Sequence, residues 1–108
     1  MNNGIWLIES PVQMGEGEVI AYSVDWLGAS KVETPDVIVY KNGQDVTSTV
    51  MVSGDSHVVS GNVVTLKKIT AQNNDGGNQY VVVVECGVDN NIERRKFLVQ
   101  VVGGSAET

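Results

Sequence analysis

The chain has 108 residues, of which 42% are hydrophobic and 19% are charged; this is enough apolar surface for one folded domain and too little charge for a disordered chain. Its net charge of -6 disfavours whole-surface attraction to nucleic acid or to an anionic membrane. Apolar runs such as the one at residues 81–84 are far too short to cross a membrane, and a single cysteine, Cys86, excludes an internal disulfide.

The first quarter of the chain predicts strands, because apolar and polar residues alternate and helical periodicity is missing. A short strand is expected at residues 5–8, ended by Ser10-Pro11. Residues 18–26 alternate with a period of two, which predicts a second strand. Its core face is expected to carry Ile20, Tyr22, Val24 and Trp26.

The middle of the chain continues with strands and tight turns. A loop at residues 28–35 leads to a strand at residues 37–40, and the Asn42-Gly43 pair predicts a type I′ hairpin turn, because both central positions of that turn need φ > 0. The chain is then expected to return through residues 45–52. The elements after it are a strand beginning at residues 58–59, a turn at residues 61–62, a strand at residues 63–67 with Val64 and Leu66 facing inward, and a polar, glycine-rich loop at residues 72–78.

The strongest pattern is a hairpin near the end of the chain, with arms at residues 80–86 and 97–102. Both arms are rich in β-branched and aromatic residues, which favours two long paired strands.

Two registers fit the turn of this hairpin. A turn at residues 90–91 pairs Glu85 with Lys96, two opposite charges. A turn one residue earlier instead places Arg95 opposite Val84, which sets a charge beside the core. The first register is therefore preferred.

Short strands separated by turns, with no helix between them, predict an antiparallel sandwich or barrel. Tyr80 opens the penultimate strand after a glycine-rich loop, which is where a tyrosine corner lies in immunoglobulin-like sandwiches. We predict an all-β, immunoglobulin-like antiparallel β-sandwich of about seven strands without a disulfide. Residues 1–102 are expected to form the single domain, and residues 103–108 a flexible C-terminal tail.

Two surface features are candidate binding sites. The tip of the last hairpin is expected to project past the core, and it carries four charged residues, Glu93, Arg94, Arg95 and Lys96. They suit contact with another subunit or an acidic partner; the alternative is a solvated ribbon whose charges protect its edge. Trp6 is a candidate ligand-binding ring, because the other aromatic residues mostly fall on predicted core faces: Tyr22, Trp26, Tyr40, Tyr80 and Phe97.

No catalytic, metal or cofactor site is expected. His57, the single histidine, directly follows Ser56, and neighbouring strand residues point to opposite faces, so the imidazole is badly placed to act as its base. The oxygen-rich loop at residues 72–78 offers calcium ligands, but its spacing matches no EF-hand and its composition is that of ordinary turns. Cys86 is expected to be a packed strand residue; an exposed reactive thiol is the alternative.

Several segments resemble small proteins of phage and prophage structural gene clusters. The resemblance is carried by residues 17–28, residues 39–51, residues 60–66 and the closing hairpin that begins at Tyr80. It covers nearly the whole chain and implies a virion or assembly component, such as a tail, head–tail or baseplate protein. It brings no catalytic residue with it.

The expected function is therefore that of a non-enzymatic phage or prophage structural protein that contacts other virion proteins or itself, as in a homo-oligomer. The alternative is a stand-alone binding module for a bacterial surface glycan or protein. Neither function involves nucleic acid, a membrane or a cofactor. Because no basic leader with an apolar segment is visible at the start, synthesis in the bacterial cytoplasm without a signal peptide is expected, with later incorporation into a virion.

Overall fold

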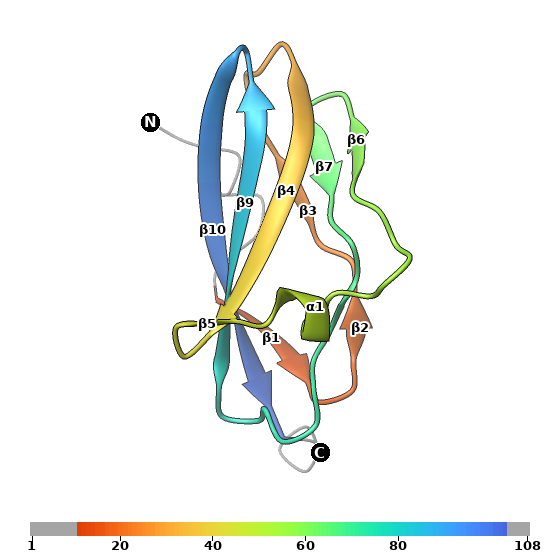
Figure 1. Ribbon diagram of the computed structural model, residues 1–108, viewed down its shortest axis with the longest axis vertical. Coiled ribbons are helices and arrows are strands. Elements are labelled where there is room, and N and C mark those ends of the chain that lie inside the picture. Colours follow the sequence, from red (N-terminus) through yellow and green to blue (C-terminus); the bar gives the residue numbers. More distant parts are fainter. Residues whose placement is uncertain (1–10, 104–108) are drawn as a thin grey trace.

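The computed structural model describes residues 11–103 and shows two layers of β-sheet (Figure 1). The larger layer is a five-stranded sheet that contains, in spatial order, β1 (Val12–Gly15), β10 (Asn91–Val102), β9 (Gln79–Val88), β4 (Val32–Lys41) and β5 (Gln44–Asp45). The other layer contains a three-stranded sheet of β3 (Ser23–Asp25), β7 (Val63–Thr65) and β6 (Val58–Ser60), and a two-stranded sheet of β2 (Val19–Ile20) and β8 (Ile69–Thr70). One helical turn, α1 (Thr47–Val50), follows β5.

This arrangement is an all-β, immunoglobulin-like sandwich, so the predicted fold is confirmed. One pairing differs from the antiparallel expectation, because β1 runs parallel to β10 with Val12 opposite Val99. The strand expected at residues 18–26 is interrupted, and its two parts, β2 and β3, pair with β8 and β7. Across the interruption the Leu66 N–H still donates to the Tyr22 carbonyl at 2.8 Å. The strand expected at residues 5–8 lies outside the described residues, as does the tail after Gly103.

The core lies between the two layers and is built from alternate residues of the strands. The inward residues of β9 are all buried: Tyr80, Val82, Val84, Cys86 and Val88. The other layer contributes Val24, Trp26, Val64 and Leu66, as their alternation predicts. Ile20 and Tyr22 are only half-buried and pack against the margin of this core.

The tyrosine corner predicted at Tyr80 is confirmed. The Tyr80 hydroxyl accepts a hydrogen bond from the Gln72 N–H at 3.0 Å and donates one to the Asp75 carboxylate at 2.5 Å. One buried side chain thereby joins the loop before β9 to the start of that strand.

The last hairpin turns at Asp89-Asn90, so the preferred register, with its turn at residues 90–91, is wrong. Asp89 has φ 50° and Asn90 has φ 72°, which are the two left-handed positions that a type I′ turn needs. Arg95 therefore does lie opposite Val84.

The charge of Arg95 is nevertheless compensated, which removes the argument against this register. Its guanidinium carbon lies 5.1 Å from the centre of the Trp26 ring, within the range of a cation–π contact. Its Nη2 also lies 3.1 Å from a carboxylate oxygen of Glu93. The guanidinium thus covers the rim of the core while keeping an anionic partner.

The observed register makes Arg94, and not Lys96, the partner of Glu85, with Nη2 and Oε2 2.7 Å apart. In a double-mutant cycle, alanine substitutions at Glu85 and Arg94 are expected to show a coupling energy of about 0.2–1 kcal/mol, the range of exposed cross-strand ion pairs. The matched cycle of Glu85 with Lys96 is expected to show less than about 0.2 kcal/mol. Urea denaturation measures both energies, and a larger coupling to Lys96 would contradict the register.

The hairpin tip does not project beyond the core, contrary to the prediction. Val88 is buried and pairs with Val32 of β4. The Asp89 carboxylate accepts hydrogen bonds from the N–H groups of Ser30 at 2.9 Å and Lys31 at 2.8 Å. These bonds fasten the tip to the loop between β3 and β4, which ends at the same height (Figure 1).

The turn between β4 and β5 has positive φ at both central positions, 52° and 81°, as predicted. The return strand expected at residues 45–52 is wrong, because only β5 pairs with β4 and α1 follows it. The Asp45 carboxylate accepts hydrogen bonds from the N–H and hydroxyl of Thr47, and the Thr47 hydroxyl accepts one from the Val39 N–H at 2.8 Å. These local bonds compete with a strand ladder. No helix in the described part of the chain is long and apolar enough to cross a membrane.

β4 begins at Val32, inside a stretch that was expected to be a loop. Its pairing with β9 is irregular between Glu33 and Asp36, where Thr34 takes a φ of 46° directly before Pro35. Because proline has no N–H to donate, such an interruption suits a sheet edge. β5 pairs only with the last two residues of β4, so this part of β4 forms an edge of the sheet.

Candidate functional site

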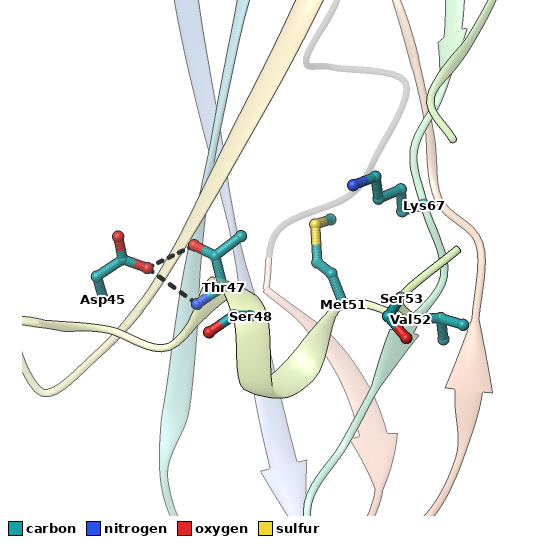
Figure 2. Close-up of a pocket in the computed structure, with 7 residues that line it drawn as sticks. All are labelled: Asp45, Thr47, Ser48, Met51, Val52, Ser53 and Lys67. Carbon is teal, nitrogen blue, oxygen red and sulfur yellow. Dashed lines mark hydrogen bonds between the residues drawn. The ribbon is translucent and has the colours of Figure 1, made fainter. Parts of the chain in front are cut away.

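An open pocket of about 570 Å³ lies beside α1 (Figure 2). Its lining comes from β5, α1, the segment after α1 and the segment after β7, and consists of Asp45, Thr47, Ser48, Met51, Val52, Ser53 and Lys67. Figure 2 shows Met51 and Lys67 extended toward one another, and Asp45 hydrogen-bonded to Thr47 at the start of α1. The lining of the pocket thus combines one acidic and one basic side chain with two apolar side chains and three hydroxyl groups.

The electrostatics of the pocket suit binding rather than proton transfer. Hydrogen bonds from the Thr47 hydroxyl and N–H lower the pKa of Asp45, so this exposed carboxylate is ionised at neutral pH and donates no proton. Lys67 supplies a cation to the same lining. This arrangement offers hydrogen bonds and opposite charges to a small polar ligand.

The neighbours of His57 and Cys86 fix the protonation state of each side chain. The His57 Nδ1 accepts a hydrogen bond from the Lys67 N–H at 3.0 Å, and burial, together with the Lys67 charge, lowers the pKa of His57. Cys86 is fully buried, and its burial raises the pKa of the thiol to about 11. The imidazole is therefore neutral and fixed at neutral pH, and Cys86 is a packed, protonated strand residue, as expected.

The four charged residues predicted as an interface do not form one patch. Glu93 and Arg95 alternate with Arg94 and Lys96 along β10, so the two pairs lie on opposite faces of the sheet. Arg95 is turned to the core side over Trp26. Arg94 and Lys96 are exposed on the outer face.

Two further candidates from the sequence are Trp6 and the oxygen-rich loop at residues 72–78. Trp6 lies outside residues 11–103. In the loop at residues 72–78, Asp75 is 6% exposed and accepts hydrogen bonds from Lys41 Nζ at 2.8 Å and from the Tyr80 hydroxyl. Burial opposes ionisation, but the bonds from Lys41 and Tyr80 outweigh it and lower the pKa of Asp75. Among the described residues no group of three or more histidine, cysteine or acidic side chains is placed to hold a metal ion.

The feature that sequence reasoning missed is the outer face of the five-stranded sheet. Ile38 of β4 lies beside Val83 of β9, and Tyr40 lies beside Val81. All four side chains are half-buried and none belongs to the core cluster or packs against it. We call these four residues the apolar outer face. The expectation that Tyr40 faces the core is wrong, because Val39 takes the inward position.

A sequence signal for this face was present in residues 81–84. A strand with one face in water normally alternates apolar and polar residues, whereas a continuous apolar run indicates a strand that is covered on both faces. In β9 the valines at 82 and 84 are fully buried, so those at 81 and 83 are the surplus apolar residues.

Charged residues border the apolar outer face toward the hairpin tip. Asp36, Glu85 and Arg94 lie side by side across β4, β9 and β10, and Lys96 lies beside Val83 one row below. Glu85 and Arg94 form an ion pair with each other. Asp36 and Lys96 form none with any residue that the structure describes. The acidic and basic borders therefore lie on opposite sides of the face.

Comparison with known proteins identifies no relative by sequence: no family model matches the chain, and no curated protein matches it. Among solved structures, the chain is similar to the titin domains z1z2 in complex with telethonin, with 15% identity and a TM-score of 0.43. The match covers 89% of this chain and 45% of that one, so this chain spans less than half the length of that neighbour.

Proposed function

We propose that this chain is a non-enzymatic structural or assembly protein of a phage or prophage particle, and that it acts through protein–protein contacts. The resemblance of its framework segments to proteins of phage structural gene clusters supports a role as a component of such a particle. The apolar outer face supports the mode of action, and it is the observation that carries the proposal.

An apolar face that is half-buried and lies outside the core suits an interaction surface. Soluble proteins rarely leave contiguous apolar patches in water unless another molecule covers them. Here the apolar outer face lies between a charged row and a row of glutamines, Gln79 and Gln100, that pair on neighbouring strands. An apolar centre with a polar rim is the usual anatomy of a protein interface.

The alternative function, a binding module for a bacterial surface glycan or protein, is supported by the pocket beside α1. Its size falls within the range of ligand sites. However, none of its seven lining residues is aromatic, and aromatic rings supply the large contact area that such pockets usually use. The apolar outer face therefore supports the first function more strongly.

The test is the composition of particles released from a bacterium that carries this gene in an inducible prophage. The chain is expected to co-purify with the particles through a density gradient, and deletion of its gene is expected to lower the yield of infectious particles. The matched control is a strain with the gene restored elsewhere. Particles that lack the chain and form in full yield without the gene would contradict the proposal.

A further inference from the structure

We propose that the apolar outer face binds the same face of a second copy of this chain, with a twofold axis along β9. The inference rests on the proposed function, because it names the partner of the surface that carries that function. It is argued from the register of the strands and the placement of charges on the face.

The centre of the face is suited to self-association because its apolar residues lie in two adjacent rows. Ile38 and Val83 form one row, and Tyr40 and Val81 form the next. Val81 is also paired with Leu98 of β10, which extends the second row across three strands. Burying such rows against an apolar partner removes area from water at roughly 25 cal/mol per Å².

The charges on the face favour one geometry for two identical copies. A twofold axis parallel to β9 places β10 of one copy over β4 of the other. Arg94 then faces the partner's Asp36, and Lys96 lies one row, about 7 Å, from the same carboxylate, a gap that a lysine side chain spans. Val81 and Val83 meet their own copies, and Tyr40 meets the partner's Leu98. Lys96 lies over the partner's Ile38, and the two Glu85 carboxylates that meet on the axis are each paired with Arg94 of their own copy.

The other twofold orientation is disfavoured by the same residues. An axis perpendicular to the strands places β10 over β10 and reverses its direction. Arg94 would then face the partner's Leu98, and the charged row of one copy would cover apolar residues of the other. Burying a charge without a partner costs several kcal/mol, so the arrangement along β9 is the one that the face supports.

Lys96 and Asp36 of one copy lie on strands that are not neighbours. β9 separates β10 from β4, so the two strands lie about 10 Å apart, and the structure has no ion pair between these residues. A second copy is thus the occupant that satisfies both charges at once, because each copy contributes the group that the other lacks.

The first test is the mass of the purified full-length chain in solution across a wide concentration range. Analytical ultracentrifugation is expected to show a reversible change from 11.6 kDa to twice that mass. Val83→Arg places a charge at the centre of the face and is expected to weaken the dimer by about 100-fold or more. Val19→Arg is the matched control, because Val19 is 50% exposed on β2 in the other layer, and it is expected to leave the dissociation constant unchanged.

The second test uses charges at exposed positions, where substitution does not threaten the fold. Lys96→Asp and Asp36→Lys are each expected to weaken the dimer by about tenfold. The double variant K96D/D36K restores opposite charges at position 96 but sets Arg94 against a lysine, so it is expected to recover only part of the affinity that either single variant loses. Circular dichroism of each variant confirms that the sandwich is intact.

Either of two results overturns the inference. One is a wild-type chain that stays monomeric up to the highest concentration reached. The other is a dimer that ignores both Val83→Arg and the charge exchange, which would place its interface elsewhere. Both results concern the isolated chain, so they are distinct from failure of the proposed function, which is judged by whether particles contain the chain.

Discussion

Replacing Trp26 with alanine is expected to lower the free energy of unfolding by about 3–5 kcal/mol, the range for loss of a large buried aromatic residue. Trp26 is 2% exposed and directly follows β3. The Arg95 guanidinium lies over its ring, 5.1 Å from the ring centre. The substitution removes apolar contacts of the core and also leaves a half-buried cation without its ring. Urea denaturation followed by circular dichroism measures the loss.

The matched control is the next residue. Leu27 is 56% exposed, so Leu27→Ala is expected to change stability by no more than about 0.5 kcal/mol. If the two alanine variants were equally stable, Trp26 would not be the buried link between β3 and the hairpin that the structure describes.

Replacing Asp75 with asparagine is expected to lower the free energy of unfolding at pH 7 by about 2–4 kcal/mol, because a buried carboxylate loses its charge-assisted bonds. The Asp75 carboxylate holds Lys41 at 2.8 Å and the Tyr80 hydroxyl at 2.5 Å. Its side chain is 9% exposed, whereas that of Lys41 is 29% exposed, so water partly compensates the lysine in the variant. Thermal and urea denaturation measure the difference.

This effect has a defined direction with pH. The pKa of Asp75 is lowered in the folded chain from its usual 3.8, so the stability it contributes is fully present above pH 3.8 and is lost as the pH falls through the lower folded value. The wild type and Asp75→Asn are therefore expected to converge in stability as the pH falls below the folded pKa of Asp75, which lies under 3.8. Asp25→Asn is the control, because the Asp25 side chain makes no hydrogen bond or ion pair among the described residues. Two parallel pH profiles for wild type and Asp75→Asn would contradict the role of Asp75.

The fold class follows from the sequence because the alternation of β9 and β10 reports directly which residues are buried. The same alternation places Val24, Val64 and Leu66 correctly in the other layer. Alternation does not show whether a strand keeps the same pairing partner along its whole length. A strand that loses its partner at one residue keeps its pattern, and the break between β2 and β3 was therefore not visible.

The errors at the site have a shared physical cause. The register with Arg95 opposite Val84 is tolerated because Trp26, from the other layer, and Glu93, two residues earlier on β10, compensate the charge of Arg95. Tyr40 falls on the face of its strand that the sequence predicts to be the core side, but its neighbour Val39 occupies that side. Tertiary contacts decide both outcomes, and a pattern within one strand does not contain them.

The apolar outer face was within reach of sequence reasoning. The valine run of β9 predicts a long strand, and it also indicates that the second face of that strand is covered by another molecule or element. The pocket beside α1 was not accessible in the same way, because it depends on the turn that Thr47 forms with Asp45 in place of a strand.

The parallel pairing of β1 with β10 affects the order in which the strands pair during folding. Val12 and Val99 are partners although almost the whole described chain lies between them, and contacts so distant in sequence form slowly because a long loop must close first. During synthesis, β1 leaves the ribosome well before its partner β10. The hairpin of β9 and β10 is local and is expected to form first. Closure of β1 is therefore expected to be a late event in folding.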